Sequence, residues 1–318
     1  MPDGLLSSIY NYLIIYFVIF AISSISGMFS ERVGIVNIGI NGMMVIGAAT
    51  YLVFTQQLYT WFGSKSIGTS PWWQIVGMLF AMICAALFSL LHGFATIKLK
   101  SDHTISGFSI NLLAFGIALI LLNIYGNNSK APKMLVEELR WSVKDSKGFI
   151  WEIFSLKTFI VIAVIVVSSI MLYKTKWGLR FRSIGENPQA ADVAGINVNS
   201  YKWQGVIISG ALAGIAGSFF AHSFPAAFRG DVNGFGYLAL AIMIMGQWNV
   251  GIIASISFVF ALLYSFAYTT PNFYLNLKPL RDLFLVIPYF LTLIIVIATA
   301  KKSHAPAASG IAYDKSKR

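Results

Sequence analysis

The chain has 318 residues, of which 57% are hydrophobic and 11% charged, and its formal net charge at pH 7 is +11. Ordinary soluble domains have about 45–50% apolar and about 25% charged residues, so this composition excludes a fold of that class and predicts one surrounded by lipid. The basic residues lie between apolar runs and in the tail, which argues against nucleic acid as a partner and favours a role in membrane topology.

Nine apolar segments follow one another along the chain. Because about 20 apolar residues cross the bilayer core as a helix, and because these runs lack the alternation of barrel strands, we predict an all-α, polytopic transmembrane helix bundle over residues 1–300, with about eight to ten spanning segments. The segments are 5–29, 33–54, 72–97, 104–125, 157–173, 203–226, 235–246, 250–268 and 282–300.

The apolar segment 235–246 is too short to cross the bilayer upright. It is followed by Gly246-Gln247-Trp248-Asn249 before the next apolar run begins. Backbone that leaves the helical pattern at membrane depth is tolerated where it lines a cavity and not lipid. We therefore expect a half-helix or a re-entrant segment at this position.

The distribution of Lys and Arg predicts the orientation of the bundle. If successive segments alternate in direction, one set of connections holds 13 of these residues, at Arg32, Lys98 and Lys100, in the loop 173–202 and in the tail. The other set holds ten, and six of them lie in the acidic loop 126–156 and at its edge, Lys157. The positive-inside rule then places the loop 173–202 and the C-terminus on the cytoplasmic side of the inner membrane.

The tail, residues 301–318, mixes Lys, Ala, Ser, Gly and Pro. A segment of this composition has too little apolar surface to offset the entropy lost on folding. We therefore expect it to be a disordered cytoplasmic end.

The loop of about residues 174–202 contains the run GLRFRSIGENPQAADVAGINV. Asn187 followed by Pro188 predicts the N-cap and first turn of a short helix, and Gly195 suits the residue just past its end. An alanine surface with charged flanks suits docking into a groove on a partner, while a well-capped connector is the other interpretation. The surface and its flanks consist of Ala190, Ala191, Ala194, Arg180, Arg182 and Glu186.

Two stretches carry a resemblance to a known family. GENPQAADVAGI, residues 185–196, resembles the coupling-loop signature of ABC importer permeases in the branched-chain amino acid and simple-sugar superfamily. GMFSERVGIVNIGINGMMVIGA, residues 27–48, is similar to that family's early ERxGxxNIGxEGMM segment, in the form typical of the branch that serves nucleosides and simple sugars. The position that is usually acidic in NIGxEG is Asn41 here, which leaves the role of that acidic residue in doubt.

The resemblance implies a permease subunit that imports a small neutral solute, with a nucleoside first and a simple sugar second. It implies no catalytic residue and no cofactor in this chain, because the partner subunit uses the ATP. The implied partners are cytoplasmic ABC ATPase subunits, a second identical or similar permease subunit and an extracytoplasmic solute-binding protein. The residues implied in ATPase coupling are Arg180, Arg182, Gly185, Glu186, Asn187, Pro188, Ala190, Ala191, Ala194 and Gly195.

Polar residues inside the apolar segments are candidates for the solute path. Asn37 and Asn41 are four residues apart and would share one face of a helix, where two amides can bond a sugar or a base. Asn111 and His222 are further polar positions in apolar surroundings. Each of the four could instead bond a neighbouring helix. No metal site is predicted, since His222 and His92 are far apart in the sequence.

Several motifs of catalysis and fuel binding are absent from the sequence. No Gly-Lys dipeptide occurs, which excludes a Walker A loop. No nucleophile elbow or HExxH motif occurs, and Cys84 is the only cysteine, which argues against an intramembrane enzyme and excludes an intrachain disulfide. An ion-coupled secondary transporter or channel stays as the alternative, although the predicted spans contain no central Asp or Glu and Asp282 lies at a boundary.

Overall fold

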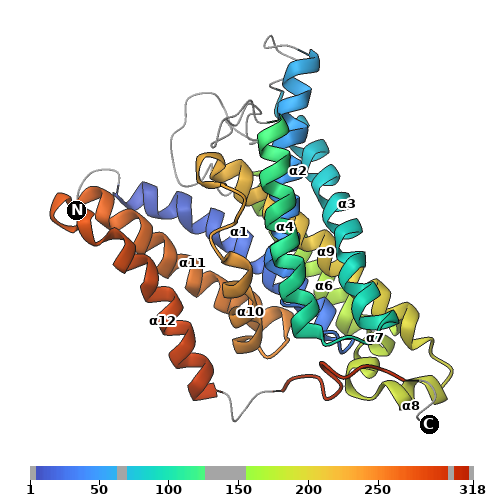
Figure 1. Ribbon diagram of the computed structural model, residues 1–318. Helices are drawn as coiled ribbons and strands as arrows, with labels where there is room; N and C mark the ends of the chain where they lie inside the picture. Colours follow the sequence, from blue (N-terminus) through green and yellow to red (C-terminus); the bar gives the residue numbers. More distant parts are fainter. Residues whose placement is uncertain (1–4, 63–69, 126–154, 300–303, 315–318) are drawn as a thin grey trace.

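The computed structural model describes residues 5–62, 70–125, 155–299 and 304–314, so the acidic loop after the fourth segment lies outside the described residues. Among the described residues there is no β-strand. The α-helices, labelled as in Figure 1, are α1 Leu5–Glu31, α2 Ile40–Phe62, α3 Trp73–Gly93, α4 His103–Tyr125, α6 Leu156–Lys174, α7 Lys176–Glu186, α8 Pro188–Val193, α9 Val198–Ser223, α10 Phe235–Met245, α11 Val250–Phe273 and α12 Arg281–Thr299. Shorter helical pieces are η1 Phe94–Lys98, η2 Pro225–Ala227 and η3 Leu275–Leu280.

Each of the nine apolar segments predicted from the sequence contains a helix, but in the segment 33–54 helix α2 begins only at Ile40. Asn37 therefore precedes the helix, and the prediction that it shares a helix face with Asn41 is wrong. In the described part of the chain, seven of these helices are long and apolar enough to cross a membrane, namely α1, α3 with η1, α4, α6, α9, α11 and α12. Helix α2 has the length, but it contains Asn41, Gln56 and Gln57 and is mostly buried inside the bundle. The predicted all-α transmembrane bundle is confirmed, and α10, with 11 residues, is the short helix expected at 235–246.

Helices α1, α2, α3 and α9 form the centre of the bundle, and α9 packs against the other three. Glycine lets α2 and α9 approach closely, because a Cβ atom on Gly217 would lie 2.0 Å from the carbonyl oxygen of Met44. A Cβ atom on Gly47 would lie 2.6 Å from the Cα atom of Gly214. Small residues are the usual basis of such close contacts in membranes, where no hydrophobic force drives helices together.

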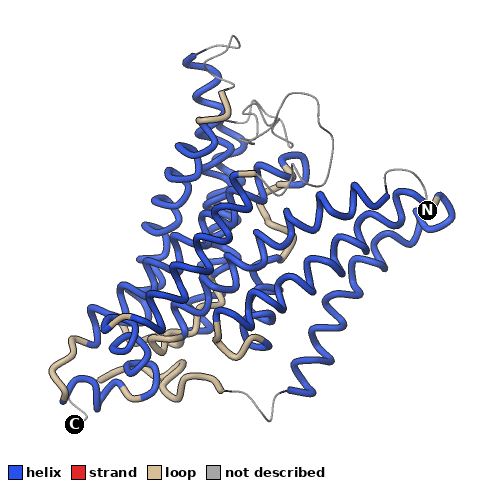
Figure 2. Tube along the Cα trace, turned by 180° about the vertical axis from the view of Figure 1, so that it is seen from behind, coloured by secondary structure: helices blue, strands red, loops and turns tan. Residues whose placement is uncertain are grey.

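Two flanks of the molecule are joined by α1. Helices α2, α3, α4 and α9 run side by side on one flank, and α11 and α12 form the opposite one (Figures 1 and 2). Helix α1 packs against both α9 and α11. The short helix α10 lies between the flanks, in contact with α1, α2, α11 and α12. Its position places the half-helix in the interior and not at the edge of the bundle.

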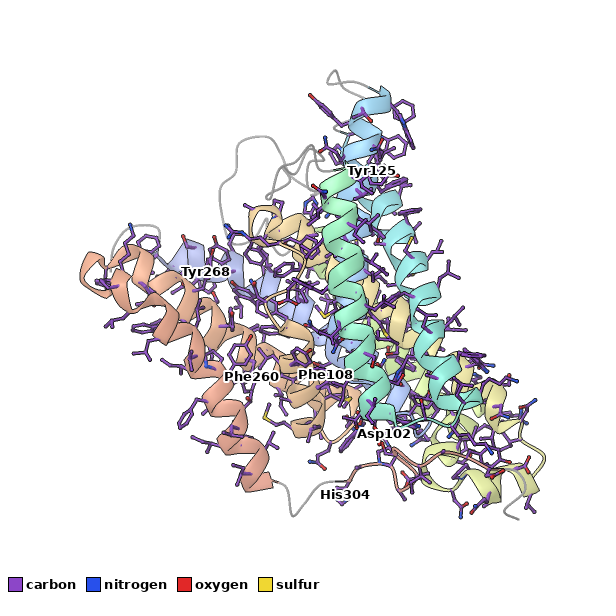
Figure 3. The ribbon with its side chains drawn as sticks, viewed as in Figure 1. Asp102, Phe108, Tyr125, Phe260, Tyr268 and His304 are labelled. Carbon is purple, nitrogen blue, oxygen red and sulfur yellow. The ribbon has the colours of Figure 1, made fainter. Side chains whose placement is uncertain are left out.

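One end of the bundle, where α1 finishes beside Arg32, is called the Arg32 end. Asp102 and His304 lie at this end and Tyr125 at the opposite one (Figure 3). Four helices begin at the Arg32 end with an Asn or Asp side chain that accepts hydrogen bonds from backbone N–H groups of the first turn, which would otherwise lack partners. For example, the hydrogen bonds from the backbone N–H groups of Ile105 and Thr104 lower the pKa of the Asp102 carboxyl. The capping residues are Asp102 for α4, Asn187 for α8, Asn197 for α9 and Asn249 for α11.

Residues 304–314 lie across the Arg32 end in a defined conformation, in contrast to the disorder expected for the tail. The N–H of Ala308 donates to the carbonyl oxygen of Gly185 at 2.8 Å, and the N–H of Gly310 donates to that of Gly34 at 3.1 Å. The side chain of Ala308 is buried. Composition underestimates this order because the segment is held by backbone hydrogen bonds and by a few side chains, among them the small buried ones of Pro306 and Ala308, which need little apolar surface.

Candidate coupling surface and polar interior

The short helix α8 begins and ends where the sequence predicts. The Oδ1 atom of Asn187 accepts a hydrogen bond from the N–H of Ala190 at 3.0 Å, and Pro188 occupies the first turn. Gly195 has φ of +80°, which an L side chain rarely adopts. The N–H groups of Gly195 and Ile196 return to carbonyl oxygens of α8 in the pattern of a Schellman motif. These local bonds fix α8 independently of any partner.

The exposed face of α8 differs from the predicted alanine surface. Ala190 and Ala194 are exposed, but Ala191 is only 4% exposed and packs into the bundle. Val193, which was not among the predicted coupling residues, is 77% exposed, and Leu179 on α7 is 64% exposed. The spacing of three and four residues could have indicated that Val193 shares a face with Ala190, whereas Ala191 lies one residue away around the helix.

The charged flank predicted for α8 is carried by α7 and its end. Arg180 and Glu186 are exposed, so their charges remain available to a partner. The guanidinium carbon of Arg182 lies 5.3 Å from the ring centroid of Tyr173 on α6, a cation–π geometry. Arg182 is therefore half-buried and holds α7 against α6.

Gly185 and Glu186, the last residues of α7 directly before α8, are called the base of α8 and rest on the end of α1. Gly185 is required there, because a Cβ atom would lie 2.3 Å from the carbonyl oxygen of Arg32. The side chain of Arg32 donates from Nε and Nη2 to the carbonyl oxygen of Trp248, at 3.1 and 2.8 Å. Burial lowers the pKa of this guanidinium, and the nearby charge of Glu186 is among the effects that oppose the shift.

The turn between α10 and α11 is held by the same end of α1. The indole Nε1 of Trp248 donates to Oε2 of Glu31 at 2.7 Å. Gln247 and Trp248 have φ of +52° and +53°, a backbone conformation that costs free energy for residues other than glycine and asparagine. This contact was not predicted from the sequence, in which the adjacent charges of Glu31 and Arg32 after a long apolar run were the available signal.

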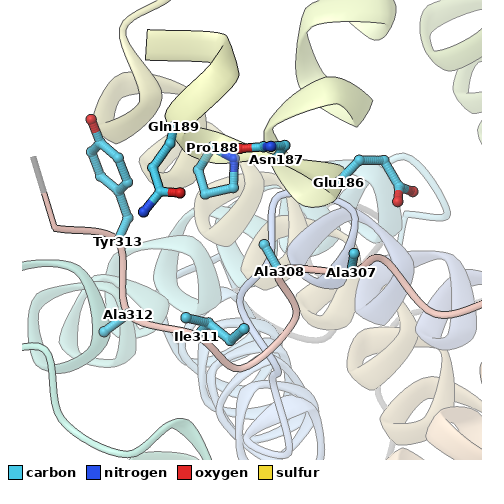
Figure 4. Close-up of a pocket in the computed structure, with 9 residues that line it drawn as sticks. All are labelled: Glu186, Asn187, Pro188, Gln189, Ala307, Ala308, Ile311, Ala312 and Tyr313. Atoms are coloured by element: carbon cyan, nitrogen blue, oxygen red, sulfur yellow. The ribbon is translucent and has the colours of Figure 1, made fainter. Parts of the chain in front are cut away.

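A surface cavity of about 230 Å³ separates the start of α8 from residues 304–314 (Figure 4). Asn187 and Gln189 line it on the side of α8, and Ala308 and Ile311 line it on the opposite side. The contact between the two segments is therefore made at Gly185, while the outer part of α8 stands clear.

Two of the predicted polar residues bond neighbouring helices. Asn37 is fully buried, and its Nδ2 donates to the Oγ of Ser209 at 3.1 Å. The Oδ1 of Asn111 accepts a hydrogen bond from the N–H of Gly42 at 2.7 Å, and its Nδ2 donates to the hydroxyl of Tyr237 at 3.0 Å. The contact of Asn37 favours a role in helix packing. Asn111 packs helices too, through Gly42, but it also bonds Tyr237, whose side chain is 40% exposed.

Asn41 joins the start of α10 to a carboxylate inside the bundle. Its Nδ2 donates to Oδ1 of Asp231 at 3.0 Å, and its Oδ1 accepts a hydrogen bond from the N–H of Gly236 at 3.2 Å. Asp231 is half-buried, because residues 224–234 turn back from the end of α9 toward the interior. Asp231 lies in a connection between two predicted spans, so the spans themselves still contain no central Asp or Glu.

A family model for the permease component of the branched-chain amino acid transport system matches residues 9–296. The chain belongs to this permease family. The resemblance derived from the two motifs is thereby confirmed.

Two named relatives match nearly the whole permease, and a third matches about four fifths of it. It is 38% identical to the nucleoside ABC transporter permease protein NupC of Lactococcus lactis, over 96% of each chain. It is 34% identical to the guanosine ABC transporter permease protein NupQ of Bacillus subtilis, over 99% of this chain and 98% of that one. A putative glucose ABC transporter permease protein of Haloferax volcanii is 27% identical over 81% of this chain and 76% of its own. No solved structure matches the permease.

The four polar residues predicted for the solute path are not brought together in the permease. Asn41 and Asn111 both lie beside the start of α10. His222 instead lies near the end of α9, where its Nδ1 is 2.8 Å from the hydroxyl oxygen of Tyr51. Within the described residues, no group of three or more His, Cys, Asp or Glu side chains could hold a metal ion.

Proposed function

We propose that this permease is the membrane-spanning subunit of an ATP-binding cassette importer for nucleosides, with simple sugars as the second candidate. The observation that carries the substrate class is the nearly full-length similarity to two permeases whose names state nucleoside and guanosine transport. The lower identity to a putative glucose permease supports the second candidate. In this proposal the chain provides the path for the solute through the membrane and the docking site for the ATPase subunits, which hydrolyse the ATP.

Energy enters this permease through α8. The exposed side chains of Ala190, Val193 and Ala194 are called the coupling surface, and they suit an apolar groove on a cytoplasmic ATPase subunit. Exposed charges of Arg180 and Glu186 lie beside it. A connector without a partner has no need of an exposed valine on a helix that is capped at both ends.

The Arg32 end faces the cytoplasm in the cytoplasmic membrane. This assignment is supported by the basic residues of that end, among them Arg32, Lys98, Lys100 and those of the loop 173–202. A solute-binding protein then meets the opposite end, and a second identical or similar permease subunit lies alongside in the bilayer.

The solute passes the start of α10. A half-helix that begins inside the bundle is a recurrent feature of transport sites, because its free backbone groups are available at membrane depth. Asp231, Asn111 and Tyr237 supply acceptors and donors around this point. A nucleoside, which is uncharged and rich in hydroxyl groups, can exchange hydrogen bonds with such groups without neutralising a buried charge.

The ion-coupled alternative draws its support from Asp231, because a carboxylate inside a membrane bundle can bind a proton or a cation. The two functions are separated by nucleoside uptake into membrane vesicles that contain the complete transporter and are loaded with ATP, with proton and sodium gradients collapsed by ionophores. The importer retains uptake under these conditions. Uptake that disappears with the gradients and ignores ATP would establish the alternative.

A further inference from the structure

Residues 304–314, called the C-terminal strap, bind the base of α8 to the connection between α1 and α2. The N–H of Ala308 donates to the carbonyl oxygen of Gly185, and the N–H of Gly310 donates to that of Gly34. A Cβ atom on Gly34 would lie 3.0 Å from the carbonyl oxygen of Ala308. The strap is thus packed on both neighbours at once, and the buried methyl group of Ala308 lies at the centre of this contact.

The strap also reaches other connections of the Arg32 end. The N–H of His304 donates to Oε1 of Gln247, between α10 and α11, at 2.6 Å. Asp314 forms an ion pair of 3.1 Å with Lys100, which precedes α4. The Nζ of Lys202 on α9 lies 5.9 Å from the ring centroid of Tyr313. One segment of the chain therefore connects helices from both flanks of the bundle.

The strap does not cover the coupling surface. The cavity lies between the strap and the start of α8, and Val193 remains exposed. A segment that holds the base of α8 and leaves its outer face free can pass a displacement of α8 to the bundle without competing with a docked partner.

The contacts continue from the strap to α10. Gln247, which the strap contacts, precedes Trp248, and Trp248 is bonded by both Glu31 and Arg32. The other end of α10 is bonded to Asn41. Because α10 is a short helix held at both ends, a movement of its C-terminal turn reaches the start of the half-helix.

We propose that the C-terminal strap is a positioning segment that fixes the base of α8 to the turns around Gly34 and Gln247, so that movement of α8 is transmitted to α10. The proposal rests on the proposed function, in which an ATPase subunit moves α8. Coupling of this kind requires a connected structural element whose arrangement both sites bias.

The test uses the complete transporter in proteoliposomes and compares two substitutions within the strap. Ala308→Glu places a long charged side chain in the contact between Gly185 and Gly34, whereas Ala305→Glu, at an exposed position, is the matched control. A third variant replaces residues 304–314 by a Gly-Ser segment of equal length. The measurements are subunit stoichiometry, ATP hydrolysis without solute, and nucleoside taken up per ATP hydrolysed.

We expect Ala308→Glu and the Gly-Ser variant to assemble and to hydrolyse ATP without solute at the normal rate. Their uptake per ATP should fall about fivefold or more, within the range reported for coupling residues, while Ala305→Glu stays normal. Normal uptake per ATP in both disrupted variants, or loss of subunit assembly in both, would overturn the proposal. A wild-type transporter that takes up no nucleoside with ATP would instead contradict the proposed function, so the two failures are distinguishable.

Discussion

Asn41 and Asp231 form the contact that sets the start of α10 against α2. The amide of Asn41 donates to the carboxylate of Asp231 and accepts a hydrogen bond from the N–H of Gly236. The family segment that this region resembles has an acidic residue at the position of Asn41. A second carboxylate at this position would face Asp231, so the amide here is explained by its partner and not by a missing function.

Exchanging the two groups tests this explanation. Asn41→Asp alone should destabilise the permease by about 1.5–3 kcal/mol, the worth of a hydrogen bond to a charged group, and should reduce uptake. Asn41→Asp combined with Asp231→Asn restores one donor and one acceptor and should recover most of the stability, which thermal unfolding in detergent measures. If the double variant loses as much stability as the two single variants lose together, the pair is not coupled.

Helix α8 presents one face to the bundle and the other to solvent. Ala191 is packed and Val193 is exposed, although both lie in the same short helix. Changes at the two positions should therefore act in different ways, one on stability and one on coupling.

Ala191→Arg should lower the free energy of unfolding of the permease by about 1–3 kcal/mol, because the larger side chain does not fit the packed position. Val193→Asp should leave stability unchanged and abolish solute-stimulated ATP hydrolysis in the complete transporter, since an apolar contact with the ATPase is lost. Val193→Ile keeps an apolar side chain and should retain coupling. If Val193→Asp couples normally, the coupling surface is assigned to the wrong face.

The Arg32 end brings together α7, α8, the strap and the turn between α10 and α11. The orientation of this end decides whether α8 can meet a cytoplasmic ATPase. In a Cys84→Ala background, which removes the only cysteine, Ala305→Cys marks the Arg32 end and Trp72→Cys the opposite one. A membrane-impermeant maleimide should label Trp72→Cys in intact cells and Ala305→Cys only in inverted vesicles; the reverse pattern would refute the proposed orientation.

The helices were predictable because hydropathy over about 20 residues reports contact with lipid directly. The ends of α8 were predictable because Asn187 and Gly195 act through local bonds. Three other features were not predictable, because each depends on tertiary contacts. They are the burial of Ala191, the position of Asp231 and the ordered conformation of the strap. Asp231 in particular follows α9 in a connection whose return into the bundle no local pattern indicates.

ATP-driven import is tested by measuring nucleoside accumulation in proteoliposomes that contain this permease, and a second permease if one is required. Samples are compared with and without the ATPase subunits. The solute-binding protein is supplied in both cases, and proton and sodium gradients are imposed in separate samples. We expect accumulation against a concentration gradient only when the ATPase subunits and ATP are present. Accumulation by the permease without ATPase subunits, driven by either ion gradient, would contradict ATP-driven import.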